Sequence, residues 1–309
     1  MNIHEHYNIL SHKNVQNDNF NNTYQELLKK IKNNNIDVIL QDELIKILDK
    51  FKSSEMGRFL IENSGFNGFW TEYMCSYPET KGLGFNVSEN KDENYLMENL
   101  PIAIATQSRY QIFKSEIQKR LKDNIKIASL PCGLMNDILS LNFQDYKNFM
   151  LHGIDLDSSS LQQARAISLT KGLTYHCKFT REDAWEINYK NEYDLFISNG
   201  LNIYVDNDEK QIEMYKKIHN SLKERGELIT STTVPPPDYN VDSTWKMDKI
   251  NSEGIRLQTL FFKHFTNFNE NTLRTPKQLC SILEKSGFSN FKILPDVLGV
   301  FVTIVATKS

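Results

Sequence analysis

Acidic side chains and a glycine turn follow two apolar segments in the middle of this 309-residue chain. Gly133 comes shortly after the segment Ile125–Leu130, and Asp155 and Asp157 stand at the end of Phe149–Leu156. Short apolar segments that are partly β-branched predict buried strands. A glycine turn lets the backbone approach a ligand closely, and a carboxylate after the next strand can accept hydrogen bonds from ribose hydroxyls. These residues therefore predict half of a nucleotide-binding unit.

The composition of the turn restricts the class of ligand. A dinucleotide site uses three glycines in the pattern GxGxxG, so that backbone amides can surround a pyrophosphate. Here only Gly133 is present, followed by Leu134 and Met135. The chain also lacks the GxxxxGK[ST] pattern of a triphosphate site. An NAD-linked oxidoreductase is therefore disfavoured.

The segment Ser129–Gly133 (SLPCG) resembles the first motif of class I S-adenosylmethionine (SAM) methyltransferases. That family usually has an acidic residue and then three glycines at alternate positions of the turn. This chain departs from the pattern in three places: Ser129 stands where an acid is common, Pro131 replaces the first glycine, and Met135 replaces the last. The resemblance covers roughly residues 125–308 and implies SAM as the cofactor.

The resemblance also implies which residues bind that cofactor. Asp155 falls where the family has its ribose-binding acid, and Asp183 with Ala184 falls where an acid and the next backbone amide contact the adenine. A plain surface turn is the alternative for Asp183, and Asp157 is expected to cap a helix over Ser158–Thr170. The complete set expected to bind the cofactor is Pro131, Cys132, Gly133, Asp155, Leu156, Asp183, Ala184, Ser198, Asn199 and Arg109.

The order of the remaining elements agrees with the same family. The expected fold is α/β, with a Rossmann-like, doubly wound, mostly parallel seven-stranded sheet, its last strand antiparallel, and a helical N-terminal cap. An unrelated Rossmann-like domain is the alternative. The later elements are expected at Tyr193–Ser198 (strand), Asp208–Leu222 (helix), Leu228–Thr232 (strand), and Phe288–Ile293 with Val300–Thr307 (closing hairpin).

The chain before residue 123 has helical periodicity. Apolar residues form one-sided stripes over Asn22–Asn33 and Asp42–Phe51, and a long helix is expected from Ile102 to about Lys122. We expect residues 1–122 to form a helical cap over the substrate and residues 123–309 to form the SAM-binding domain. The helices could instead extend the core or form a homodimer.

Candidates for the acceptor side follow the fourth expected strand. Asn199, Asn202 and Tyr204 interrupt apolar residues there, where ligands bind in doubly wound folds. They predict a wall for the methyl acceptor, with turn chemistry by Asn as the alternative. His264 is the candidate base because it lies among aromatic residues, although a packed structural histidine is the alternative. The predicted catalytic set is therefore His264, Asn199 and Tyr204.

Two aromatic-rich segments favour a closed pocket over an open groove. They are residues 66–73 and 257–268, and each could equally belong to a core. The predicted function is transfer of the SAM methyl group to a small molecule, at oxygen by analogy to capped relatives. A protein or peptide methyltransferase and a SAM-binding regulator without turnover are the alternatives.

The composition of the chain restricts its expected partners, metal content and cellular location. The formal net charge is −3, which predicts no nucleic-acid partner. No stretch approaches the roughly 20 apolar residues that span a bilayer, so no membrane partner is expected. The four cysteines form no CxxC pair, so neither metal nor disulfides are expected. The polar N-terminus lacks the apolar core of a secretory signal, which predicts a cytoplasmic protein.

Overall fold

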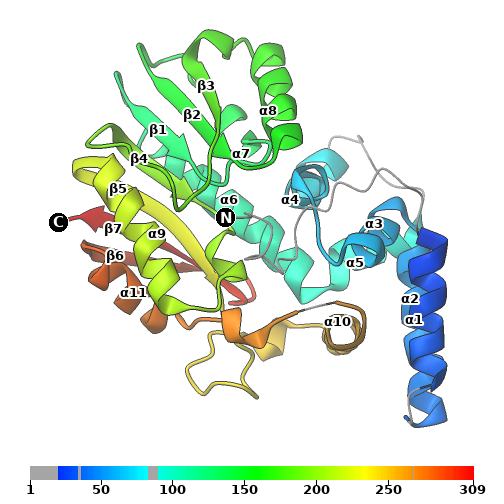
Figure 1. The fold of residues 1–309 in the computed structure, drawn as a ribbon. Coiled ribbons are helices and arrows are strands. Elements are labelled where there is room, and N and C mark those ends of the chain that lie inside the picture. The colour runs from blue at the N-terminus through cyan, green and yellow to red at the C-terminus, as the bar shows by residue number, and fades with distance from the viewer. Residues whose placement is uncertain (1–19, 34–35, 83–89, 267) are drawn as a thin grey trace. The chain divides into compact units, whose positions relative to one another are not determined.

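The computed structural model describes residues 20–33, 36–82, 90–266 and 268–309. The chain forms two compact units. A helical unit contains the described residues up to Ile104 together with 248–268, and a sheet unit contains 105–247 with 269–309. Figure 1 labels the elements of both units.

The sheet unit contains a mixed seven-stranded sheet in the order β3-β2-β1-β4-β5-β7-β6. Strands β1 to β5 are parallel, while β7 is antiparallel to both β5 and β6. The expected fold class, including the antiparallel last strand, is confirmed. The strands are β1 (Lys126–Ser129), β2 (Met150–Asp155), β3 (Cys177–Arg181), β4 (Tyr193–Ser198), β5 (Leu222–Thr233), β6 (Phe288–Pro295) and β7 (Phe301–Lys308).

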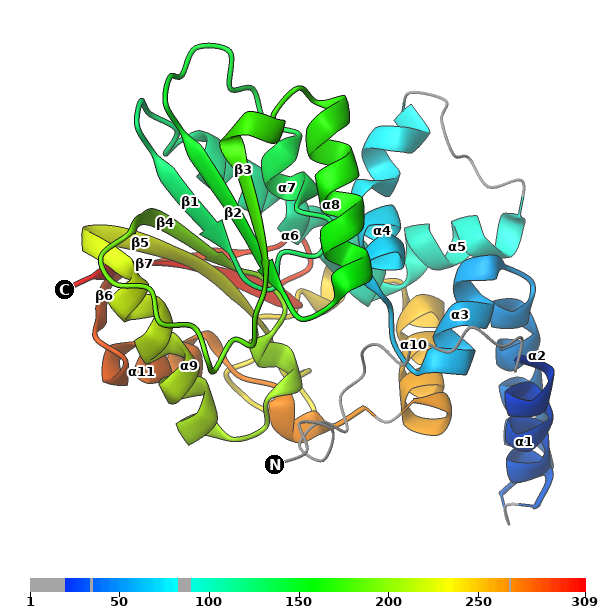
Figure 2. The same ribbon diagram turned by 45° about the horizontal axis from the view of Figure 1, so that its top comes forward.

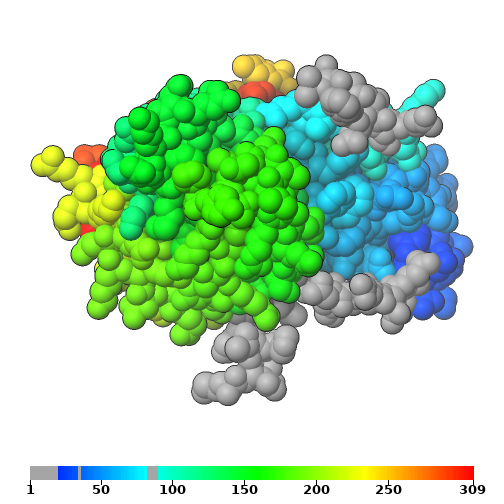
Figure 3. All heavy atoms as spheres, turned by 90° about the horizontal axis from the view of Figure 1, so that it is seen from above, coloured from blue at the N-terminus to red at the C-terminus, as the bar shows by residue number. Residues whose placement is uncertain are grey.

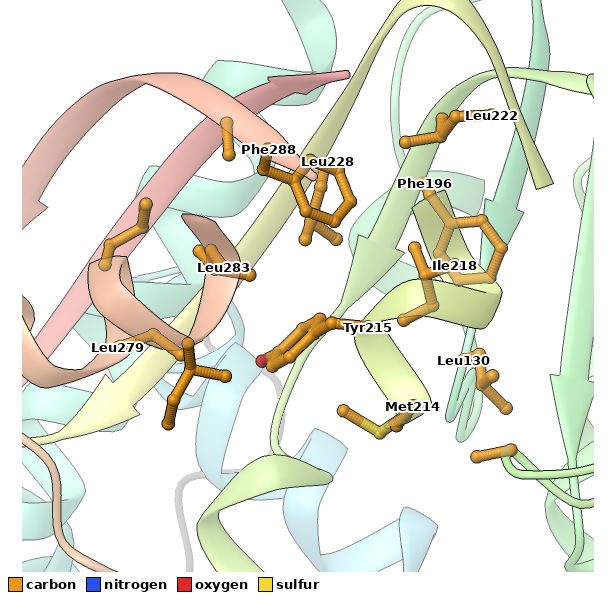
Figure 4. Packing of buried hydrophobic residues seen from close by; sticks show 14 of the residues in the cluster. Leu130, Phe196, Met214, Tyr215, Ile218, Leu222, Leu228, Leu279, Leu283 and Phe288 are labelled. Carbon is orange, nitrogen blue, oxygen red and sulfur yellow. The ribbon is translucent and has the colours of Figure 1, made fainter. Parts of the chain in front are cut away.

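Successive residues of each buried strand point to opposite faces of the sheet, so both faces are apolar. Helices cover both of them (Figure 2). Leu195 and Ile197 pack in a core with α6, α7 and α8, whereas Phe196 packs in the core of the other face with α9 and α11. In that second core Tyr215 lies among leucines of α11 and residues of α9 (Figure 4). The helices are α6 (Pro101–Gln118), α7 (Asn136–Leu139), α8 (Ser158–Thr170), α9 (Asp208–Ser221) and α11 (Pro276–Lys285).

The helical unit has its own hydrophobic core. Phe261 stacks on Phe51 with ring centroids 3.8 Å apart, and Phe265 is also buried there. The aromatic residues Trp70 and Tyr73 pack partly against the same core. The core alternative therefore holds for Phe261 and Phe265. The helices are α1 (Phe20–Asn33), α2 (Val38–Lys52), α3 (Glu55–Asn63), α4 (Gly68–Gly82), α5 (Lys91–Asn99) and α10 (Ser252–Phe265).

Left-handed backbone conformations stand before one element and inside another. The helix after the glycine turn, α7, starts at Asn136 and spans four residues, and Met135 immediately before it has a left-handed φ of 58°. Strand β5 begins earlier than expected and includes Arg225, which has a φ of 62°. The register between β4 and β5 shifts nearby, between Tyr193 and Leu195.

The loop after β5 is attached to the β6–β7 hairpin. The indole Nε1 of Trp245 donates to the carbonyl of Val234 at 2.9 Å, which ties the loop back to its own start. The hydroxyl of Thr244 donates to the carbonyl of Gly299, and the backbone amide of Lys246 donates to the carbonyl of Leu298. These bonds fix the path of the chain after its three consecutive prolines.

Candidate functional site

The glycine turn after β1 is held open toward one side. The amide of Cys132 donates to the carbonyl of Ile154 on β2 at 2.9 Å, which fixes the turn to the neighbouring strand. Gly133 has a φ of 50°, in the left-handed region that disfavours other residues. A Cβ placed at Gly133 would meet no atom within 4 Å. The turn therefore offers backbone groups next to open space, as cofactor binding requires.

Asp155 joins this turn to the end of β2. One carboxylate oxygen accepts a hydrogen bond from the amide of Gly133 at 2.8 Å, and the other accepts from the amide of Asp157 at 2.9 Å. Asp155 is 8% exposed, whereas the next side chain, Leu156, is 46% exposed although it is apolar. A carboxylate oxygen has lone pairs for more than one donor, so Asp155 can still receive ribose hydroxyls.

The Asp155 site depends on close packing beneath it. A Cβ at Gly153 would come within 2.8 Å of the Phe179 ring and 3.0 Å of the Cys132 sulfur, so the turn and β3 close over this glycine. The Cys132 thiol is buried, and burial raises its pKa well above the usual value, with Asp155 and Asp137 adding to that rise. It is therefore a neutral packing group at the turn.

The residues after β3 form a tight turn. The amide of Trp185 donates to Oδ1 of Asp183 at 2.9 Å, and Ala184 between them is buried. Trp185 itself packs against the core below and donates its indole N–H to the carbonyl of Lys210. Trp185 is therefore a packing residue, and Asp183 is half-buried with one oxygen bonded within the turn.

Several of the predicted cofactor residues thus lie at the same edge of the sheet. The carboxyl ends of parallel neighbours β1, β2, β3 and β4 meet there, and the strand order reverses between β1 and β4. The arrangement fits the adenosine part of SAM: a buried carboxylate for ribose hydroxyls, an exposed leucine for the flat adenine, and open backbone at Gly133. Among the described residues no group of three or more His, Cys, Asp or Glu side chains could hold a metal ion.

Asp137 is a buried carboxyl beside this edge. Burial raises its pKa to about 6, opposed by nearby backbone N–H groups and by the charge of Lys114. It stands in the first turn of α7, whose N-cap residue Met135 makes no side-chain cap bond. Its position suits the positive end of a helix.

Polar side chains also follow β4. Ser198 is completely buried, and its hydroxyl has no hydrogen-bond partner among the described residues. Asn199 is half-buried, and its Oδ1 accepts from the hydroxyl of Ser231 at 3.4 Å. Asn202 is buried and donates to the backbone carbonyl of Ser231 at 2.9 Å. Burial raises the pKa of Tyr204, and the charge of Arg109 opposes that rise.

Arg109 lies farther along the edge than the glycine turn. Its guanidinium is 4.0 Å from the centre of the Phe301 ring and donates to the hydroxyl of Ser231 at 3.4 Å. These partners belong to β7 and β5, whereas Gly133 and Asp155 follow β1 and β2. The structure therefore groups Arg109 with Asn199 and Tyr204.

His264, the predicted base, belongs to α10 of the helical unit. Burial lowers its pKa, and the charges of Lys263 and Lys30 lower it further. Its imidazole is therefore neutral near pH 7 and able to accept a proton. Its catalytic role stays a prediction.

Sequence reasoning did not identify Ser231 and Thr303. Both are buried polar residues, Ser231 near the end of β5 and Thr303 near the start of β7, and they are directly opposite each other in the register. The available signal is the run of hydroxyl residues that ends β5, Thr230 to Thr233.

Comparisons with known proteins agree with this geometry. Residues 121–287 match the family described as "Methyltransferase domain". A crystal structure of a possible exported protein from Bordetella parapertussis is 30% identical, with a TM-score of 0.85 over 94% of this chain and 95% of that one. A proposed O-methyltransferase from Nostoc punctiforme is 16% identical, with a TM-score of 0.51 over 85% of this chain and 71% of that one, and shows the fold alone.

Comparison with curated proteins gives no significant match. No helix in the described part of the chain is long and apolar enough to cross a membrane. The family match covers more than half of the chain, including the glycine turn, Asp155 and the end of β4. This chain belongs to the class I SAM-dependent methyltransferases.

Proposed function

We propose that this methyltransferase acts on a small-molecule acceptor and transfers the methyl group to an oxygen atom. The observation that supports an acceptor site is the group of polar side chains past β4, where Ser231 contacts both Asn199 and Arg109, and the charge of Arg109 acts on Tyr204. Polar side chains at the carboxyl end of a central strand can orient a ligand there.

The cofactor side of the proposal uses residues of the first three strands. Asp155 would hold the ribose, Gly133 would let the backbone approach, and Leu156 would cover the adenine. Bound SAM supplies a methyl group on a positively charged sulfur, which is already a strong electrophile. The task of the protein is then to orient the acceptor and to exclude water, and such alignment contributes several kcal/mol to catalysis.

The acceptor side would provide orientation and proton transfer. Tyr204 remains protonated at neutral pH, because burial raises its pKa. It can therefore donate a hydrogen bond to the acceptor. A hydroxyl acceptor loses its proton as the C–O bond forms, and His264 is the proposed group that takes that proton.

The proposal is tested by following product formation. The protein is incubated with SAM that carries a labelled methyl group and with three acceptor sets: hydroxylated small molecules, amines and unstructured peptides. Labelled O-methyl product with the first set, together with an equivalent amount of S-adenosylhomocysteine, is the expected result. Label in the peptides would overturn the small-molecule assignment, and SAM binding without product from any set would favour a regulator.

The role of His264 is tested by its pH profile. If His264 is the base, wild-type activity falls as the pH drops through its lowered pKa, and His264→Gln removes that limb and lowers kcat by about 10²-fold or more. His176→Gln is the matched control, since His176 lies in the sheet unit and bonds to the carbonyl of Phe149. Equal pH profiles for wild type and His264→Gln would exclude His264 as the base.

A further inference from the structure

A polar cluster lies on one face of the sheet, under α6. We define it as Arg109, Ser231 and Thr303. Ser231 and Thr303 are directly opposite in the antiparallel β5–β7 register, so their side chains point to the same face. Phe301, two residues before Thr303 on β7, shares that face. Because Arg109 contacts both Ser231 and the Phe301 ring, the guanidinium lies over the same part of the sheet.

The hydroxyl of Thr303 has no partner in the described structure. Thr303 is 1% exposed, and its Oγ1 is buried without a hydrogen bond. Leaving a buried hydroxyl unsatisfied is unfavourable, so such groups are normally paired. A valine would fill the same space without that cost. The hydroxyl is therefore a donor that a ligand or a water molecule would complete.

Arg109 gives the cluster a cationic group. It is permanently charged and is 6% exposed. Asp296 is an acid in the described part of the chain whose charge interacts with Arg109. The carboxylate of Asp296, however, accepts hydrogen bonds from the backbone amides of Leu298, Gly299 and Phe301. Asp296 thus holds the β6–β7 turn.

We propose that this cluster binds a carboxylate group, and that the carboxylate belongs to the methyl acceptor. A guanidinium beside the unpartnered Thr303 hydroxyl matches the oxygen atoms of a carboxylate, and such charge-assisted bonds are about twice as strong as neutral ones. The Ser231 hydroxyl, which donates to Asn199 at a long 3.4 Å, could turn to the same carboxylate. The inference rests on the proposed function. The acceptor is the favoured source because Ser231 and Thr303 lie on β5 and β7, beyond the strands that carry Gly133 and Asp155.

The methionine carboxylate of SAM is the other source of the same chemistry, and two sets of titrations separate the sources. Wild type, Arg109→Met and Thr303→Val are first titrated calorimetrically with S-adenosylhomocysteine and with 5′-methylthioadenosine, which lacks the carboxylate. The same proteins are then assayed with hydroxylated carboxylic acids and with the corresponding carboxamides. Arg120→Met is the control, because Arg120 follows the end of the same helix by two residues and pairs with Glu116 and Glu227.

The expected result is a KM for the acids that rises about tenfold or more in Arg109→Met and by a smaller factor in Thr303→Val, with the amides unaffected. The affinities of both variants for S-adenosylhomocysteine and for 5′-methylthioadenosine should stay within twofold of the wild-type values. Arg120→Met should lower stability without changing either ligand preference.

Two other results would overturn the acceptor assignment. If Arg109→Met weakens S-adenosylhomocysteine about tenfold and leaves 5′-methylthioadenosine unchanged, the carboxylate is that of the cofactor. If no affinity or KM changes and Thr303→Val only raises the melting temperature, the cluster is structural and the carboxylate site does not exist. Failure of the proposed function would look different, because wild type itself would then methylate none of the acceptors.

Discussion

The two halves of the ligand-binding edge are built differently. In the first half, past β1 and β2, the carboxylate of Asp155 binds backbone amides of Gly133 and Asp157 at 2.8 and 2.9 Å. In the second half, past β4 and β5, Asn202 also binds backbone, the carbonyl of Ser231 at 2.9 Å. Side-chain contacts there link Arg109 to Ser231 and Ser231 to Asn199, each at 3.4 Å. The usual N–H to oxygen distance is near 2.9 Å, so these side-chain contacts are weaker.

This difference suits the two ligands of a methyltransferase. Backbone amides are fixed by the strands, so the first half is preorganised for one invariant cofactor. Side chains held by long contacts can turn toward a ligand, so the second half can adapt to an acceptor. The difference also predicts that substitutions in the two halves affect separate properties.

The largest effect is expected for Asp155→Ala. It removes two charge-assisted acceptors from the backbone of the first half, so we expect SAM affinity to fall by at least about 100-fold and stability by about 2–3 kcal/mol. Calorimetric titration and urea unfolding measure the two quantities. Asp157→Asn is the control, since Asn also caps helices well and α8 should stay intact. Unchanged SAM affinity in Asp155→Ala would remove the carboxylate from the cofactor site.

The strands of the first half should also be sensitive to acid through His152. His152 is buried between the Tyr193 and Thr180 hydroxyls at 2.6 and 2.8 Å. Burial, with a smaller contribution from Lys178, lowers its pKa to about 4. The unfolded value is about 6.5, so the stabilisation from neutral His152 is complete above that pH and is lost as the pH falls toward 4, by about 3 kcal/mol in total. Urea unfolding at pH 7.5 and 5 should show the loss in wild type but not in His152→Gln.

The helix that carries Arg109, α6, has an ionic support at Glu116, which links it to Lys292 of β6. The side chain of Glu116 is 3% exposed; burial would raise its pKa, but hydrogen bonds from Lys119, Lys292 and Arg120 lower it to about 2. The stabilisation that the ionised Glu116 carboxylate contributes is present above about pH 4.5 and is lost as the pH falls toward 2. Glu116→Gln should cost about 2 kcal/mol at pH 7, measured by urea unfolding, with SAM affinity unchanged. A large loss of SAM affinity would show that the two halves are coupled.

The smallest effect is expected for alanine substitutions at two glycines, which separate backbone strain from contact with the ligand. Gly133 and Gly172 both have positive φ, 50° and 70°, and a Cβ at either would meet no atom within 4 Å. Alanine at each should cost the same 1–2 kcal/mol of backbone strain. Only Gly133→Ala should also weaken SAM, by about tenfold, because its Cβ would enter the space next to the turn. Equal SAM affinities of the two variants would mean that the ligand does not approach Gly133.

Much of the first half could be predicted from the sequence, because its signals are local. The turn at Gly133, the strand ending at Asp155 and the cap at Asp157 each lie within a few residues of the apolar segments that reveal them, and the structure confirms those elements. The start of α7 was not predictable in this way. It follows the left-handed conformation of Met135, which its residue type does not reveal.

The second half combines residues that are far apart in the chain. Arg109, Asn199, Ser231 and Thr303 meet only because α6 covers β5 and β7, and no local pattern indicates that contact. The aromatic residues of the helical unit, in contrast, have a clear local pattern, but that pattern did not identify their role. Their spacing suggested a pocket, while Phe261 fills a core, because the same spacing serves both purposes. The cap role of the helices, a homodimer through them and the cytoplasmic location stay predictions.

The central claim is that the edge past β1 and β2 binds SAM. Its most direct test is calorimetric titration of the purified protein with SAM and, separately, with NAD. We expect one SAM site per chain and no measurable heat with NAD, since a single glycine cannot surround a pyrophosphate. Binding of NAD, or of neither ligand, would contradict the account and leave only a Rossmann-like fold with a different ligand.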